Sequence, residues 1–204
     1  MSIFIRALDR YLHVFYRFWG KINYLYAYFW GIKIGKGVAF LGKTHFFRLK
    51  NTEITIGDNC SFSSSVRSNW IGINRPCMIS VQNNGGRLII GDNCGFSGTV
   101  IGAFKMIKLG NNVRCGANSL ITDADWHLDD PRTGPPLEVI IEDNVWLGVN
   151  SVVLKGVTIG ENSVIGANSV VTKNIPPNVI AAGNPCKVIK QLTSNNISDR
   201  DDSM

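Results

Sequence analysis

The hydrophobic and polar positions between Ile141 and Pro176 repeat every six residues without interruption. The successive hexads read IEDNVW, LGVNSV, VLKGVT, IGENSV, IGANSV and VTKNIP. A period of six fits neither the 3.6-residue turn of an amphipathic helix nor the two-residue alternation of a strand. It predicts a coil with three flat faces, one hexad per face. Gly, Asn and Asp would occupy the corners, where φ can turn positive.

Two positions of each hexad predict the core of this coil. The fifth positions are mostly small, and the first positions are all aliphatic: Ile141, Leu147, Val153, Ile159, Ile165 and Val171. A short fixed period marks a solenoid, whose repeats bury a common core only by stacking. We therefore expect both sets of side chains to point inward.

The hexad signal is weaker before this region. It begins near Ile34 and returns at Ile56, Ile90 and Leu109, so the later intervals are 34 and 19 residues instead of the 18 of one coil. These intervals predict loops or imperfect coils. His45 falls in the irregular early stretch, outside the regular coils that we expect.

The first 30 residues have a different pattern. Residues 2–30 hold eleven of the twenty aromatic side chains, with basic residues between them. They predict one or two amphipathic helices with a break near Gly20. Two roles are open: the segment covers the exposed end of the solenoid or contacts another subunit, or it lies on a membrane surface. The expected organisation is a helical cap at 1–33, the coil at 34–190 and a disordered tail at 191–204.

Composition describes a folded protein of 204 residues with 45% hydrophobic and 18% charged residues. Nine Lys or Arg and one acid lie in residues 1–50, whereas the other 154 residues hold twelve Lys or Arg and fourteen acids, so the net charge of +6 comes from the first segment. An almost neutral coil argues against a nucleic-acid partner. With no apolar run long enough to span a bilayer and no pattern of a secretory signal, the expected location is the cytoplasm. The membrane alternative for residues 1–30 would add peripheral contact at the inner face.

The five cysteines do not form a CxxC pair. Cys60 and Cys94 both follow the sequence IGDN, at the fifth position of a hexad. We expect them to be small buried residues and not metal ligands or disulfide partners.

The repeat is interrupted between Ile121 and Ile141, where the sequence TDADWHLDDPRTGPP is polar and rich in proline. A loop that leaves a rigid scaffold often carries function. His127 lies in this loop, and its pKa class suits a general base near neutral pH. Acidic neighbours such as Asp123 and Asp125, or a backbone carbonyl, could orient its ring. The other two histidines are His13 and His45.

The stretch IGENSVIGANSVVTKNIPPNVIAAGNPCKVIK resembles the hexapeptide-repeat acyltransferases. The resemblance covers about residues 34–190 and is closest to the sugar O-acetyltransferases, which include maltose, galactoside and polysaccharide acetyltransferases. It implies an all-β fold, a left-handed parallel β-helix, and a homotrimer with each site between two coils. It also implies acetyl-CoA as co-substrate, a sugar or polysaccharide precursor as acceptor, direct transfer and no metal.

The resemblance also implies roles for individual residues. TDADWHLDDP is similar to the segment that carries the catalytic histidine, which makes His127 the general base. Weaker assignments to the acceptor or to orienting His127 are Asp123, Asp125, Ser97, Thr99 and Trp126. The residues that match positions around acetyl-CoA are Trp146 beside the acyl group, Gly148, Val149, Gly166 and Ala167 along the pantetheine arm, and Thr172, Lys173, Lys187 and Lys190 near the adenosine phosphates.

One departure bears on the acceptor. Galactoside-type enzymes have an asparagine on an earlier coil, where this chain has GFSGTVIG, and this favours a polysaccharide-type acceptor. The alternatives are N-acylation of an amino sugar nucleotide, O-acylation of serine, a non-catalytic binding scaffold and, more remotely, a zinc enzyme of the γ-carbonic anhydrase type. The zinc site would need three histidines on neighbouring coils.

Overall fold

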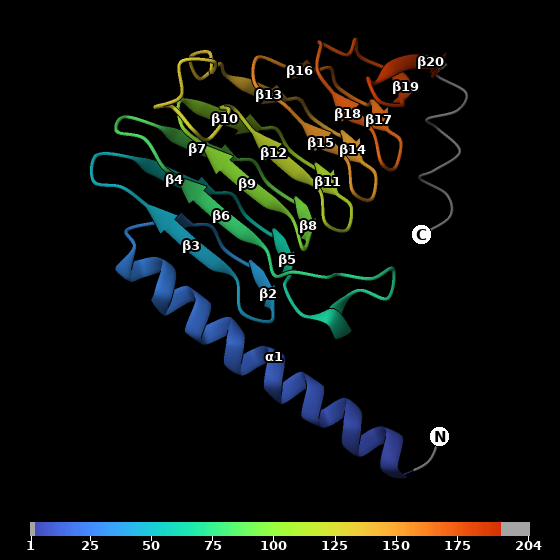
Figure 1. The fold of residues 1–204 in the computed structure, drawn as a ribbon. Coiled ribbons are helices and arrows are strands. Elements are labelled where there is room, and N and C mark those ends of the chain that lie inside the picture. Colours follow the sequence, from blue (N-terminus) through green and yellow to red (C-terminus); the bar gives the residue numbers. More distant parts are fainter. Residues whose placement is uncertain (1–2, 193–204) are drawn as a thin grey trace.

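In the computed structural model, which describes residues 3–192, three sheets wind into a three-sided coil (Figure 1). Sheet A contains β1 (Lys33–Ile34), β4 (Glu53–Ile56), β7 (Arg87–Ile90), β10 (Met106–Leu109), β13 (Val139–Ile141) and β16 (Thr158–Ile159). Sheet B contains β2 (Ala39–Leu41), β5 (Ser61–Ser63), β8 (Gly95–Ser97), β11 (Arg114–Cys115), β14 (Trp146–Leu147), β17 (Val164–Ile165), β19 (Val179–Ala182) and β20 (Lys187–Gln191). Sheet C contains β3 (His45–Arg48), β6 (Met78–Val81), β9 (Val100–Ala103), β12 (Leu120–Thr122), β15 (Val152–Val153) and β18 (Val170–Val171).

The chain passes from sheet A to B to C in each turn, so three corners run along the molecule. We call them the A–B, B–C and C–A corners after the sheets that they join. Neighbouring strands are parallel except for β19 and β20, which close the last coil as an antiparallel pair. Of the predicted tail at 191–204, Gln191 lies in β20, and residues from 193 onward lie outside the described residues.

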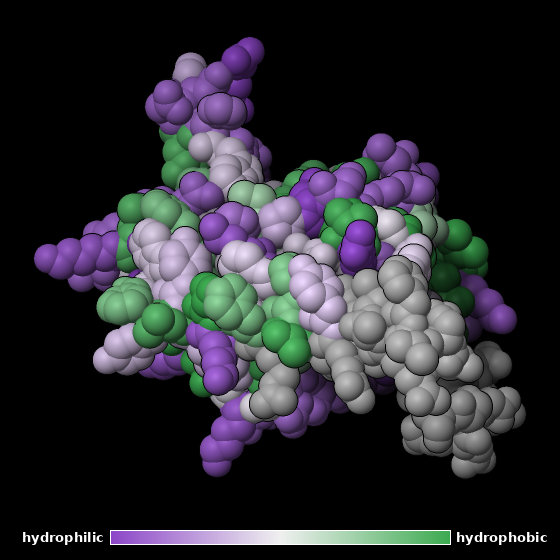
Figure 2. Space-filling view, turned by 90° about the horizontal axis from the view of Figure 1, so that it is seen from below, coloured by the Kyte–Doolittle hydropathy of each residue, from purple (hydrophilic) through white to green (hydrophobic). Residues whose placement is uncertain are grey.

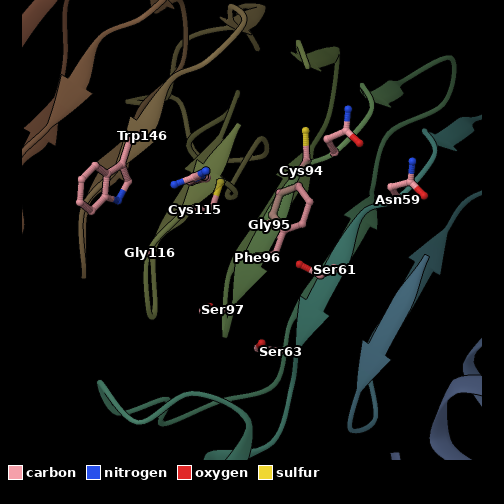
Figure 3. Close-up of a pocket in the computed structure, with 12 residues that line it drawn as sticks. Asn59, Ser61, Ser63, Cys94, Gly95, Phe96, Ser97, Cys115, Gly116 and Trp146 are labelled. Atoms are coloured by element: carbon pink, nitrogen blue, oxygen red, sulfur yellow. The ribbon is translucent and has the colours of Figure 1, made fainter. Parts of the chain in front are cut away.

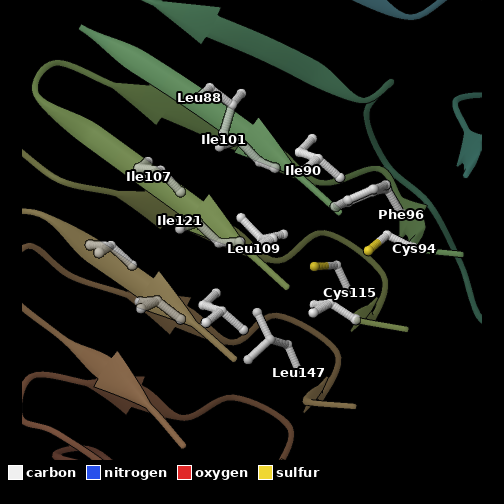
Figure 4. Packing of buried hydrophobic residues seen from close by; sticks show 14 of the residues in the cluster. Leu88, Ile90, Cys94, Phe96, Ile101, Ile107, Leu109, Cys115, Ile121 and Leu147 are labelled. Carbon is white, nitrogen blue, oxygen red and sulfur yellow. The ribbon is translucent and has the colours of Figure 1, made fainter. Parts of the chain in front are cut away.

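Inward-pointing ladders form the core (Figure 4). All six predicted first-position residues are fully buried, and so are the fifth-position residues from Val145 to Ser169. On sheet B the ladder begins with stacked phenyl rings, Phe40 on Phe62 and Phe62 on Phe96, with centroids 5.2 and 4.8 Å apart. It continues through Cys115 and Leu147 in register. The predicted inward positions are therefore confirmed, including buried Cys60 and Cys94.

Asparagines at the corners adopt left-handed backbone conformations. Asn112, Asn144, Asn162 and Asn178 all have φ between 57° and 59°. Their side chains form a ladder from coil to coil, each Nδ2 donating to the next Oδ1 at 3.0 Å. Asparagine tolerates this conformation better than other residues with a Cβ, which explains its place in the hexad.

Glycine occupies the second position of a hexad for a different reason, which is the close stacking of one coil on the next. Gly57 has no positive φ, but a Cβ there would lie 2.6 Å from the backbone carbon of Gly91 on the next coil. It would also meet the carboxylate of Asp92, which accepts a hydrogen bond from the Asp58 amide at 2.7 Å. The sequence IGDN thus combines an inward aliphatic residue, a close backbone contact, an amide acceptor and a left-handed corner.

The early part of the coil is more regular than the sequence indicates. Residues 33–63 form strands in all three sheets, and His45 lies in β3, paired with Met78. The prediction that His45 stands outside the regular coils is therefore wrong, because Phe residues such as Phe46 fill the inward positions where a hexad would have Ile or Val. The long interval before Ile90 comes from residues 64–77, an excursion between β5 and β6 that includes η1 (Val66–Ser68).

Helix α1 (Ile3–Phe29) is continuous through Gly20, so the predicted break is absent. Its second half covers the first coil: Ala27 is fully buried, and the side-chain amide of Asn23 donates to the Gly42 carbonyl at 2.8 Å. Asn23 also accepts from the Thr44 amide at 3.0 Å. The first half extends beyond the coil (Figure 1). No helix within the described residues is both long and apolar enough to cross a bilayer.

We expect Gly57→Ala to destabilise the coil, because the added methyl group would press the Gly91 backbone of the neighbouring coil. Overpacking of this kind costs about 1–3 kcal/mol, which corresponds to a fall in Tm of roughly 2–12 °C for a chain of this size. Thermal unfolding followed by circular dichroism measures the change.

The matched control is Gly20→Ala in α1, where nothing lies within 4 Å of the added Cβ. Removing a helix-interior glycine should raise stability by about 0.5–1 kcal/mol. Equal Tm changes in the two variants would contradict the stacking explanation.

Candidate active site

A groove of about 450 Å³ runs along the B–C corner of the later coils. Its lining includes the five residues that the sequence analysis placed around the acyl group and the pantetheine arm: Trp146, Gly148, Val149, Gly166 and Ala167. The structure therefore brings together residues from two successive coils, β14 and β17 with the turns that follow them. Sequence analysis missed Gly116 and Ala117, although their hexad, CGANSL, repeats the same glycine-and-small-residue pair.

Small residues expose the backbone in this groove because the coils stack closely. A Cβ on Gly148 would lie 2.6 Å from the Ala167 amide nitrogen, and one on Gly116 would lie 2.8 Å from the Gly148 carbonyl carbon. Only glycine fits at these positions. The result is an apolar channel with few side chains across it, which suits an extended ligand that can bond to main-chain groups.

The excursion 64–77 forms one wall of this groove through Asn69 and Ile71. It is fastened to the corner by hydrogen bonds: the Asn69 amide donates to Ser97 Oγ at 2.9 Å, and the Asn118 amide donates to the Gly72 carbonyl at 3.0 Å. Arg75 Nε donates to the Gly98 carbonyl at 3.2 Å. The sequence predicted a loop or an imperfect coil in this interval, but it did not show which corner the segment covers.

A second, shallower groove of about 370 Å³ crosses the outer face of sheet B (Figure 3). Hydroxyl groups of Ser61, Ser63 and Ser97 line it, and Trp146 belongs to both grooves. Arg114 is the one charged residue in its lining. The predicted acceptor candidate Ser97 is therefore beside this groove. Thr99 is fully buried, with its hydroxyl 3.2 Å from Ser119 Oγ, so it does not reach the surface.

His127 stands exposed in the loop 123–138, which joins β12 of sheet C to β13 of sheet A. The loop backbone is turned tightly around it. Its amide donates to the Asp125 carbonyl at 2.9 Å, and its carbonyl accepts from the Asp130 amide at 3.0 Å and from Thr133 Oγ1 at 3.1 Å. The fold thus fixes the main chain at His127 and leaves the ring in solvent.

One of the weaker predictions was that Asp123 orients His127, and the structure contradicts it. It is fully buried, and its carboxylate accepts hydrogen bonds from three successive backbone amides, at Phe104, Lys105 and Met106, between 2.6 and 2.7 Å. Burial raises the pKa of this carboxyl, and the amides oppose the rise. Its carbonyl also accepts from the Leu137 amide at 2.9 Å. Asp123 therefore anchors both ends of the loop to the C–A corner.

Asp125 and Trp126 hold the same loop. The Asp125 carboxylate lies 2.5 Å from Lys155 Nζ, and this hydrogen bond lowers the pKa of Asp125. The indole of Trp126 donates to Thr122 Oγ1 at 3.0 Å and lies over Gly102, where a Cβ would collide with it. Within one chain, these contacts show that Asp125 and Trp126 hold the loop in place. Trp126 is still 41% exposed, so one face of it is open.

The four residues predicted near the adenosine phosphates divide into two groups. Thr172 and Lys173 follow β18 and lie at the C–A corner of the last coil. Lys187 and Lys190 are exposed on β20, and Lys187 pairs with Ala182, whose Cβ lies near Gly166 of the groove. Lys187 is therefore next to the groove, whereas Thr172 and Lys173 share the corner of His127.

The most informative feature of this arrangement is that His127 and the groove occupy different corners. The groove follows sheet B and the loop precedes sheet A, so sheet C separates them within one chain. The loop cannot swing across, because Asp123, Asp125 and Trp126 tie it to its own corner. Within residues 3–192, no three His, Cys, Asp or Glu side chains gather as metal ligands would.

Comparison with known families agrees with the geometry. Residues 138–173 match the family model described as the hexapeptide repeat of succinyl-transferase. Residues 138–173 therefore form a hexapeptide repeat. The fold class expected from the sequence, an all-β left-handed parallel β-helix with an N-terminal helix, is confirmed.

Part of the chain is also similar in sequence to named acetyltransferases. The galactoside O-acetyltransferase of Escherichia coli is 41% identical over 99 residues, which are 47% of this chain and 46% of that protein. The 2,3,4,5-tetrahydropyridine-2,6-dicarboxylate N-acetyltransferase of Staphylococcus aureus is 38% identical over 81 residues, 40% of this chain and 31% of that protein. The matched part thus spans less than half of the length of these relatives.

Among solved structures, a mutant of AntD, an N-acyltransferase from Bacillus cereus, was determined with dTDP-4-amino-4,6-dideoxyglucose and coenzyme A. It superimposes with a TM-score of 0.63 over 83% of this chain and 89% of that one, at 19% identity. At this level of identity the similarity concerns the fold.

A bulky side chain in the B–C groove should prevent a coenzyme from binding. Ala167→Trp places an indole at an exposed position of the groove lining. We expect this variant to fold and to bind coenzyme A at least about tenfold more weakly, because the channel would be filled. Isothermal titration calorimetry with coenzyme A measures the change.

Glu161→Trp is the matched control, since it adds the same indole to an exposed position of the same coil at the A–B corner. Similar affinities for Ala167→Trp and the unmodified protein would show that the groove is not the coenzyme site.

Proposed function

We propose that this protein is an acetyl-CoA-dependent O-acetyltransferase that acts on a hydroxyl group of a sugar or polysaccharide precursor. The observation that carries the proposal is the groove at the B–C corner, where the residues expected around a pantetheine arm line one channel. The resemblance to galactoside O-acetyltransferase supports the same reaction class.

The groove suits the acyl donor. A pantetheine arm is long, thin and interrupted by amides, so it needs a narrow apolar channel with accessible main-chain groups. Gly148 and Gly166 provide this, because both line the groove and neither adds a side chain of its own to it. Trp146 stands at the junction with the second groove, where the thioester would meet the acceptor. Lys187 pairs with Ala182 beside the groove, so it could contact the phosphates of the coenzyme as a cation.

His127 would act as the general base. An alcohol is a weak nucleophile, so its proton must move as the oxygen attacks the thioester carbonyl. In the proposed step, the acceptor oxygen bonds to the acetyl carbon while His127 takes the hydroxyl proton. The carbon–sulfur bond then breaks, and the thiolate of coenzyme A takes the proton from the imidazolium. Backbone amides near the groove would stabilise the oxyanion between these two events.

Two copies of the chain would complete the site. Because His127 and the groove lie at different corners, one copy would supply the groove and a neighbour would supply its C–A corner. That corner brings Thr172 and Lys173 together with His127, so the neighbour would also contribute to binding the adenosine phosphates. A closed trimer repeats this contact three times with one interface. The corner geometry supports the homotrimer that the family resemblance implies.

The acceptor would lie in the shallower groove on sheet B. Serine hydroxyls, including Ser97, can bond to sugar hydroxyls there, and Arg114 adds a positive charge with no acidic residue in the same lining. Such a surface favours an acceptor that carries a carboxylate or phosphate. This agrees with a polysaccharide precursor more than with a neutral galactoside.

The direct test is His127→Ala in an assay of thiol release from acetyl-CoA. We expect turnover to fall by about 10²–10⁴, the usual contribution of a general base, while the affinity for coenzyme A stays within about twofold. The acceptors would include neutral sugars, uronic acids, nucleotide-linked amino sugars and serine.

His45→Gln is the control, since His45 lies in β3 near the opposite end of the coil. Normal turnover of His127→Ala would remove the proposed base. If only the amino sugars are acetylated and His127→Ala is still inactive, the reaction is N-acylation at the same site and not O-acylation.

A further inference from the structure

We propose that the outer face of α1, together with the tip of the excursion 64–77, is a docking surface for an anionic lipid membrane. The proposal does not depend on the chemistry of the groove. It follows from a helix that covers the first coil with one face and exposes an apolar stripe on the other.

The exposed stripe of α1 consists of large hydrophobic side chains. Its described members share helical spacing and exposures between 57% and 77%: Tyr11, Val14, Phe18, Leu25, Tyr28 and Phe29. Because successive helical residues are about 100° apart, these six fall within an arc of roughly 100°. Figure 2 shows hydrophobic residues in green on this side of the molecule, between hydrophilic residues in purple.

This stripe faces away from the coil. Asn23 and Ala27, which are buried against the first coil, lie on the opposite side of the helix. A helix that only caps a coil would have one apolar face and one polar face. The outward face of α1 is also apolar, so capping explains only the inward face. Within residues 3–192, no element covers the outward stripe.

The charge pattern favours a negatively charged partner. Residues 1–50 contain nine Lys or Arg and one acid, whereas the remaining 154 residues are nearly neutral. In the sequence, Arg6, Arg10, Arg17 and Lys21 follow each other at intervals of four, seven and four residues, which is the helical period. Apolar aromatic residues accompanied by regular basic residues are the pattern of a helix that lies in a membrane interface.

A second element carries the same kind of surface. In the excursion 64–77, Trp70 is 95% exposed, and Val66 is also exposed. The excursion lies beside the first half of α1, because Tyr11 and Phe15 line one cavity with Ser65 and Val66. Tryptophan is favoured at the boundary between lipid and water. Figure 1 shows α1 and η1 of the excursion at the same end of the coil, so two separate segments carry exposed apolar residues there.

The test uses the full chain and sedimentation with vesicles. We expect binding to vesicles of phosphatidylcholine with phosphatidylglycerol, and at least about tenfold weaker binding to phosphatidylcholine alone or at high salt. Phe18→Ser with Leu25→Ser should reduce the binding by about tenfold or more, because it removes two inserted side chains. Trp70→Ser should weaken it as well, without affecting α1.

The matched control is Val188→Ser with Ile189→Ser, which removes two exposed apolar side chains from β20 at the far end of the coil. This variant should bind vesicles normally. Circular dichroism checks that the helix is retained in every variant. Equal binding to both vesicle types, or unchanged binding of Phe18→Ser with Leu25→Ser, would overturn the proposal. One further result would overturn it: no form of the protein binds vesicles, and light scattering shows an oligomer that Phe18→Ser with Leu25→Ser no longer forms. A second copy of the chain would then cover the stripe.

Discussion

Close stacking of one coil on the next at the corners governs this structure. At Gly57, Gly148 and similar positions the backbone of the next coil lies so near that no Cβ fits. The asparagines that follow take left-handed conformations and bond to their counterparts on the neighbouring coils. The same packing leaves main-chain groups uncovered at the B–C corner, so the requirement that forms the coil also forms the groove.

The sequence predicted the coil because each hexad position has one physical role that repeats. It predicted the groove residues through resemblance, and the structure placed all five in one channel. It failed where packing replaced the repeat: Phe40, Phe62 and Phe96 fill inward positions that aliphatic residues occupy later. Asp123 looked like a partner of His127 because the two are close in sequence, yet its backbone contacts come from residues 104–106 on the preceding coil.

The fold also separates tasks along the molecule. The exposed apolar stripe lies on α1, over the first coil, whereas most of the groove lies on the coils of β11, β14 and β17. Adjacent strands of a sheet are about 4.8 Å apart, so three to five coils place the groove roughly 15–25 Å from that end. An acceptor attached to a membrane would need to extend over this distance to reach His127.

We propose that each active site joins the groove of one copy to His127 of another. The direct measurement is thiol release by a mixture of two inactive variants, His127→Ala and Ala167→Trp, unfolded together and refolded at equal amounts. If sites form between copies, random trimers contain some sites with an intact groove and an intact histidine, and activity returns to about a quarter of that of the unmodified protein. If each chain holds a complete site, the mixture stays as inactive as its components, and that result would contradict the account.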